Sequence, residues 1–192
     1  MNNLFSEAKA AQTAAFFLHR AHGRMPVLKL MKLIYLAERR SYELHGEPFI
    51  GDTLVSMEHG PVLSRTLNRM NGSVASSADG WDSWIADREG HDVALSDPSR
   101  IRSPEQDLLA LSDAELEILG ETWNSFGHLS KFELQDLTHK ICPEWEDPDG
   151  SSIPISFDKL FSALKFDAEQ IKAIKARLAQ QQRINAAVSS SE

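Results

Sequence analysis

Apolar residues recur at intervals of three or four along the first 44 residues, and this spacing predicts two consecutive helices. The first is expected over residues 3–22, with Gly23 in the position where glycine often ends a helix. The second is expected over residues 26–44 with Pro26 as its first residue, since no amide hydrogen is needed there. The polar side chains expected largely on its solvent-facing side are Lys29, Lys32, Glu38 and Arg39.

The next part of the chain predicts a small amount of β-structure. Residues 53–57 are expected to be extended, and Pro61 is expected to open a third helix over residues 61–70. Residues 81–87 and 91–95 are predicted to form two strands of a hairpin, joined by a short turn.

The second half carries stronger helix signals. Ser112 with Glu115 and Ser130 with Glu133 are capping boxes, in which a serine hydroxyl and a glutamate carboxylate accept free backbone amides. The helices expected here run over residues 112–126, 130–142, 156–164 and 168–187.

These elements predict a mainly α protein, a compact single domain of about seven helices with a small β-hairpin or short β element. Residues 1–165 are assigned to this domain. Residues 166–192 are expected to form a basic C-terminal helix and a frayed tail.

Charge is distributed unevenly along the chain. Residues 1–70 carry 9 Lys or Arg against 6 Asp or Glu, whereas residues 71–158 carry 5 against 19. The acidic middle of the chain would repel nucleic acid and could attract a basic partner, or it could serve solubility alone. No apolar run approaches the roughly 18 residues of a membrane span, so we expect a cytoplasmic protein without a membrane contact.

Candidate chemistry is sparse. His19 with His22, and His139 with Cys142, have helical spacing, but neither pair completes a zinc ligand set. Cys142 precedes Pro143 near a predicted helix C-terminus, where the helix dipole disfavours a thiolate. No glycine-rich phosphate loop is present. We therefore expect no catalytic set, no metal and no cofactor.

Trp145 lies in an acidic loop, where a large ring either packs back onto the domain or faces a partner. The carboxylates around it could form a docking surface for a basic protein, or serve solubility alone, and they are Glu144, Glu146, Asp147 and Asp149.

Several short motifs together resemble the Panacea domain of antitoxins, also called the SocA-like or phage-associated GepA-like family. The similarity covers residues 28–165. The matching motifs are Lys32-Leu33-Ile34-Tyr35, Gly46-Glu47-Pro48, Gly60-Pro61-Val62, Phe126-Gly127, Leu134 with Thr138-His139, and Pro143-Glu144-Trp145. Ile34 stands where a tyrosine is often found in the family.

The resemblance implies an antitoxin that neutralises a cognate toxin by direct binding, in some members as an adaptor to an ATP-dependent protease. We hypothesise that the toxin contacts the segment that joins the family's helix to its turn. The partner-binding residues proposed on this basis are Tyr35 (from beneath), Met57, Glu58, His59, Pro61 and Trp145.

Two other functions remain open at this stage. A DNA-binding autoregulator could contact phosphates through four basic residues of the last helix, Lys172, Lys175, Arg177 and Arg183. No helix-turn-helix pattern is convincing, and nucleic acid is not the expected partner. An unrecognised hydrolase would require a deep pocket with perturbed histidines. The toxin's identity and the oligomeric state do not follow from the sequence.

Overall fold

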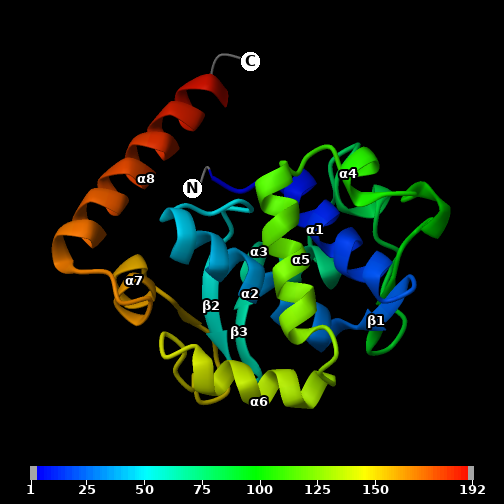
Figure 1. The fold of residues 1–192 in the computed structure, drawn as a ribbon, viewed down its shortest axis with the longest axis horizontal. Helices are drawn as coiled ribbons and strands as arrows, with labels where there is room; N and C mark the ends of the chain where they lie inside the picture. Colours follow the sequence, from blue (N-terminus) through cyan, green and yellow to red (C-terminus); the bar gives the residue numbers. More distant parts are fainter. Residues whose placement is uncertain (1–3, 190–192) are drawn as a thin grey trace.

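A computed structural model describes residues 4–189 of the chain, and this part is mainly α-helical. Eight α-helices and two small antiparallel sheets lie within these residues, so the predicted fold class is confirmed (Figure 1). One sheet pairs β1 with β4, and the other has the strand order β3-β2-β5.

Both N-terminal helices begin later than predicted. Helix α1 spans Glu7–Arg20, and the Ser6 side chain caps it by accepting the Lys9 amide. Pro26 is the last residue of strand β1 and the N-cap of helix α2, which spans Val27–His45. Backbone pairing with β4 therefore keeps Pro26 out of the helix that its own conformation would allow.

Helix α2 is the centre of the fold. It packs against α1, α5 (Asp113–Phe126), α6 (Lys131–Ile141) and strand β3 (Gly60–Leu63). These neighbours leave α2 little surface that faces solvent. Most of its residues are therefore buried, including polar ones.

The prediction that Lys32 and Glu38 face solvent is therefore wrong, because both side chains are fully buried. Buried charged groups need partners, and Glu38 finds three in the loop after α2. Its carboxylate accepts the amides of Phe49, Ile50 and Gly51 at 3.1, 3.0 and 2.8 Å. Glu38 thus fixes the path of the chain between α2 and the first strand of the larger sheet.

That sheet corrects the prediction for Pro61. Strand β2 (Leu54–Met57) pairs on one side with β3 and on the other with the short β5 (Ile153–Pro154). Pro61 lies within β3 and does not open a helix; helix α3 begins at Ser64 and ends at Met70. An edge strand such as β3 tolerates proline because one side of it has no strand to receive an amide hydrogen.

The predicted hairpin over residues 81–95 is only partly correct. Strand β4 (Asp92–Ala94) forms, but it pairs with β1 (Arg24–Pro26). Trp81–Ser83 forms a 3₁₀ turn in place of a strand. Trp81 and Trp84 are both buried, and a spacing of three places both rings on one side of a helical turn, whereas a strand would alternate them.

The capping boxes in the second half are confirmed. Ser112 and Glu115 cap α5 with bonds of 3.4 and 2.8 Å, and Ser130 and Glu133 cap α6 with bonds of 3.3 and 2.8 Å. The connection before α5 contains a 3₁₀ turn at Pro98–Arg100 and the one-turn helix α4 at Pro104–Asp107.

Helix α7 (Phe157–Ala163) leads into the predicted basic helix α8 (Ala168–Ser189), which extends along one side of the domain (Figure 1). Ile171, Ile174 and Leu178 are buried. Of the frayed tail expected at the C-terminus, residues 190–192 lie outside the described residues. Among residues 4–189, no helix combines the length and hydropathy that crossing a membrane requires.

Two of the four cations proposed for DNA contact on α8 form ion pairs with acidic residues of the same chain. Lys175 pairs with Asp158, and Arg177 pairs with Glu47 at 3.0 Å. These pairs tie α8 to neighbouring elements and reduce the positive charge it presents.

Candidate partner-binding groove

The hairpin of β2 and β3 ends in an exposed two-residue loop, Glu58-His59, with half-buried Met57 before it. Gly60 follows at φ +96°, a conformation that residues with a side chain rarely adopt. The loop therefore projects at the surface while Gly60 returns the chain to the interior.

Three polar atoms converge on the space beside Gly60. A Cβ placed on Gly60 would lie 3.0 Å from Thr138 Oγ1, 3.1 Å from Lys32 Nζ and 3.2 Å from His139 Nε2. The Lys32 ammonium donates to the Pro61 carbonyl at 2.9 Å, which engages one of its three N–H donors. His139 Nε2 is buried and has no hydrogen-bond partner among residues 4–189.

Burial weakens the basicity of this cluster. Removal from water lowers the pKa of Lys32 to about 7. The pKa of His139 is also lowered, first by burial and then by the positive charge of Lys32. At both groups the loss of hydration outweighs the attraction of neighbouring negative charges, so both pKa values are lowered.

Trp145 packs back onto this cluster. Its ring stacks on His139 with centroids 4.1 Å apart, and its Nε1 donates to the Met57 carbonyl at 2.9 Å. The tryptophan is half-buried. It therefore links α6 to the hairpin tip and holds the hairpin over α2.

Glu144, the residue before Trp145, is fully buried. Tyr35 Oη and Arg39 Nε each donate to Glu144 Oε1 at 2.7 Å, joining α2 to the loop after α6. The expectation that Glu144 belongs to an exposed acidic docking surface is therefore wrong, because its charge is neutralised inside the protein. Glu146, Asp147 and Asp149 remain exposed.

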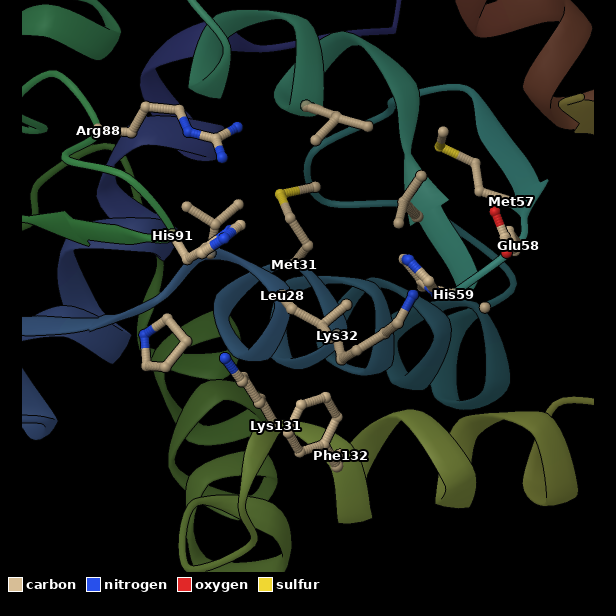
Figure 2. Close-up of a pocket in the computed structure, with 15 residues that line it drawn as sticks. Leu28, Met31, Lys32, Met57, Glu58, His59, Arg88, His91, Lys131 and Phe132 are labelled. Atoms are coloured by element: carbon tan, nitrogen blue, oxygen red, sulfur yellow. The ribbon is translucent and has the colours of Figure 1, made fainter. Parts of the chain in front are cut away.

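A groove of about 490 Å³ opens between α2, the hairpin tip, the start of α6 and the loop before β4 (Figure 2). Phe132 stands at its edge with 64% of its surface exposed, which is unusual for a ring of this size. The apolar side chains that line it include Val27, Leu28, Met31, Met57, Val62 and Leu67.

The polar residues around the groove are mostly basic. Arg88 and His91 lie on one side, Lys131 on another, and His59 at the hairpin end (Figure 2). Glu58 is the one carboxylate among the lining residues. The groove thus combines an apolar surface with a positive rim, although the chain as a whole has a net charge of −8.

The candidate chemistry considered from the sequence stays dispersed. Among residues 4–189, no three His, Cys, Asp or Glu side chains gather in a way that could hold a metal ion. Cys142 is buried, and burial raises the pKa of its thiol to about 12, which opposes a role as a nucleophile. Serine, threonine and cysteine do not occur among the residues that line the groove.

A comparison with protein families identifies the family. The family model described as antitoxin SocA-like, Panacea domain, matches residues 30–146, which is more than half of the chain. The chain belongs to this antitoxin family. The match spans α2, the hairpin, α5, α6 and Trp145, and it ends before α7 and α8. Comparisons with curated proteins and with solved structures give no match.

Within this Panacea domain, the proposed contact residues occupy two levels. Met57, Glu58 and His59 line the groove, whereas Pro61 and Tyr35 are buried below the surface. Pro61 supports the groove by accepting the Lys32 bond, and Tyr35 faces Glu144.

Sequence reasoning missed the far side of the groove. Arg88, His91, Lys131 and Phe132 come from segments whose approach to the hairpin depends on tertiary packing. One signal was present: Phe132 follows the Ser130 cap at a position that the buried face of α6, with Leu134 and Thr138, does not include. An aromatic residue outside the buried pattern indicates a binding surface.

Proposed function

We propose that this Panacea-domain antitoxin neutralises a cognate toxin by direct binding and that the toxin occupies the groove beside the hairpin tip. The observation that carries the proposal is the groove itself, an apolar surface with the exposed Phe132 at its edge. Exposed aromatic side chains beside an apolar depression are typical anchors of protein–protein interfaces.

The energetic contribution of such an anchor is substantial. Burying a phenylalanine side chain contributes about 1.5 to 3 kcal/mol, which corresponds to roughly a tenfold to hundredfold gain in affinity. Because Phe132 projects from α6 and does not fill the core, this contribution is available to a partner.

Binding alone accounts for the proposed activity, without catalysis or a cofactor. Among the lining residues burial lowers the pKa of Lys32, but Glu58, His59 and His91 are not accompanied by a serine, threonine or cysteine nucleophile. Transfer of the bound toxin to an ATP-dependent protease is a further step of the same proposal, and we place the complex in the cytoplasm.

The test is rescue of growth by co-expression. The product of the gene beside this one is induced in a host cell, with or without the chain, and growth is followed. We expect growth arrest that the wild-type chain relieves. Arrest that persists with the folded chain present would overturn the proposal. Repeating the rescue in a host without the protease separates simple binding from delivery for proteolysis.

Two double variants locate the interface. Glu58→Ala with His59→Ala alters the hairpin loop, and we expect it to weaken the rescue. Glu146→Ala with Asp147→Ala alters the exposed acidic loop and serves as the matched control. Rescue lost only in the acidic-loop variant would place the toxin away from the groove.

A further inference from the structure

One end of the groove gathers three basic groups, Lys32, His59 and His139, and none of them forms an ion pair within the part of the chain that the structure describes. Lys32 and His59 point toward each other at this end (Figure 2), and His139 lies close enough to lose basicity to both charges. Within residues 4–189 the hydrogen bond found for Lys32 Nζ goes to a carbonyl, and no ion pair involves it.

We propose that the groove holds an apolar segment of the toxin that carries one carboxylate side chain, and that this carboxylate lies beside Lys32 Nζ at the Gly60 end. The inference rests on the proposed function and specifies the chemistry of the partner. It identifies an acidic partner segment, in contrast to the basic partner that the acidic middle of the chain first suggested.

Charge complementarity selects this occupant. A carboxylate that enters the groove meets Lys32 and His59 at the hairpin end, and Arg88, His91 and Lys131 along the rim. A basic segment would meet the same groups as like charges and would be disfavoured. The apolar floor receives the hydrophobic side chains that flank the acid.

The local geometry also suits a carboxylate. Lys32 has N–H donors beyond the one that bonds to Pro61, and His139 Nε2 has no partner. Gly60 brings the backbone close to both groups, since a Cβ there would lie within 3.2 Å of each and would be crowded, so a carboxylate approaches Lys32 from the groove that Lys32 lines. A carboxylate oxygen placed near Lys32 would satisfy a buried donor and gain a charge-assisted hydrogen bond.

Such binding must take up a proton above neutral pH. The pKa of Lys32 is about 7 in the free protein, and an adjacent carboxylate raises it. Affinity then falls by up to about tenfold for each pH unit above 7, until the pKa of the complex is reached. The ionisable groups that face Lys32 or line this end are Tyr35 on α2, Glu58 and His59 on the hairpin, Lys131 and His139 on α6, Cys142 and Glu144 after it, and Arg88 and His91 before β4.

The experiment is calorimetric titration of the chain with the purified toxin identified by the rescue, in a catalytically inactive form. Dissociation constants are measured at pH 7.5 and 8.5, above the range in which an unperturbed histidine titrates. Proton uptake is obtained from two buffers of different ionisation enthalpy. Lys32→Met removes the ammonium, and Lys29→Met is the control, because Lys29 lies on the same helix but bonds to the Gly127 carbonyl outside the groove.

We expect the wild-type chain and Lys29→Met to bind with uptake of most of one proton at pH 8 and to weaken about tenfold between the two pH values. Lys32→Met should bind more weakly at pH 7.5 and lose the pH dependence. Its circular dichroism and melting curve show whether it is folded, and the proton uptake of the wild-type chain tests the inference without any variant.

Two results would overturn the inference in different ways. In the first, the toxin binds without proton uptake, and Lys32→Met and Lys29→Met show the same pH profile. This result would refute a carboxylate beside Lys32 but leave the proposed antitoxin function intact. Absence of binding and of rescue by the wild-type chain would remove the proposed function and the inference with it.

Discussion

The buried carboxylate of Glu144 provides a stringent test of how this domain is held together. It joins helix α2 to the loop that carries Trp145, through hydrogen bonds from Tyr35 and Arg39 of 2.7 Å each. Replacing Glu144 with alanine leaves the Arg39 guanidinium, whose side chain is only 15% exposed, without its acidic partner. Tyr35 Oη also loses its acceptor.

Removing one partner of a buried ion pair leaves the other charge unpaired and costs about 3 to 5 kcal/mol of stability, which is the loss expected here. For a protein of this length, such a loss lowers Tm by roughly 6 to 20 °C. Tyr35→Phe removes only the hydroxyl and should cost about 1.5 to 3 kcal/mol, as expected for a buried hydrogen bond to a charged group.

The assay is urea unfolding followed by circular dichroism at constant pH. Because the two changes remove the same hydrogen bond, the double variant should be less destabilised than the sum of the single variants, by at least about 1 kcal/mol. Glu146→Ala is the control: this neighbour forms an exposed ion pair with Lys159 and should change stability by less than about 1 kcal/mol. Equal effects of Glu144→Ala and Glu146→Ala, or an additive cycle, would refute the reasoning.

Two further predictions concern backbone geometry and acid stability. Gly60→Ala should lower the free energy of unfolding by about 1 to 3 kcal/mol because Gly60 has a positive φ. Gly72→Ala should cost less, because Gly72 shares a positive φ but has nothing within 4 Å of a Cβ. Equal melting temperatures of the two variants would contradict the crowding at Gly60. Burial raises the pKa of Glu7, but hydrogen bonds, led by that from Arg69, outweigh it and hold the pKa at about 2, below the 4.5 of an unperturbed glutamate. The stability that the Glu7 carboxylate contributes is therefore present above about pH 4.5 and is lost as the pH falls. Between pH 5 and pH 3 the wild-type chain should lose about 2 kcal/mol more of its unfolding free energy than Glu7→Gln. Identical pH slopes in urea unfolding would exclude this contribution of Glu7.

Locally encoded features of the fold were predictable from the sequence. Ser112 and Ser130 each cap a helix with the glutamate three residues later, and both partners lie within one helical turn. These features depend on residues close together in the chain, so tertiary packing did not alter them.

Features that depend on distant partners were not predictable in the same way. Lys32 and Glu38 have the residue types of a solvent-facing stripe, yet each is buried against groups contributed by another segment. Pro61 has a conformation suited to a helix start, but pairing with β2 makes it part of a strand. In both cases a long-range contact overrides the local preference.

The groove illustrates the same limit for the candidate site. Its hairpin side, Met57 to His59, was proposed from the family motifs, whereas Lys131 and Phe132 come from the first turn of α6. Only the packing of α6 against α2 and β3 brings the two sides together. Arg88, His91 and Lys131 come from the acidic middle of the chain, so the net charge of that segment does not reveal the basic rim of the groove.

The central claim is that the toxin binds in this groove, and the dissociation constant of one matched pair of variants tests it most directly. Phe132 and Leu109 are both exposed, at 64% and 79%, but only Phe132 lines the groove. With purified toxin, Phe132→Ser should raise Kd by about tenfold or more, mainly through faster dissociation, while Leu109→Ser leaves it unchanged within about twofold. Equal dissociation constants for the two folded variants would contradict the account.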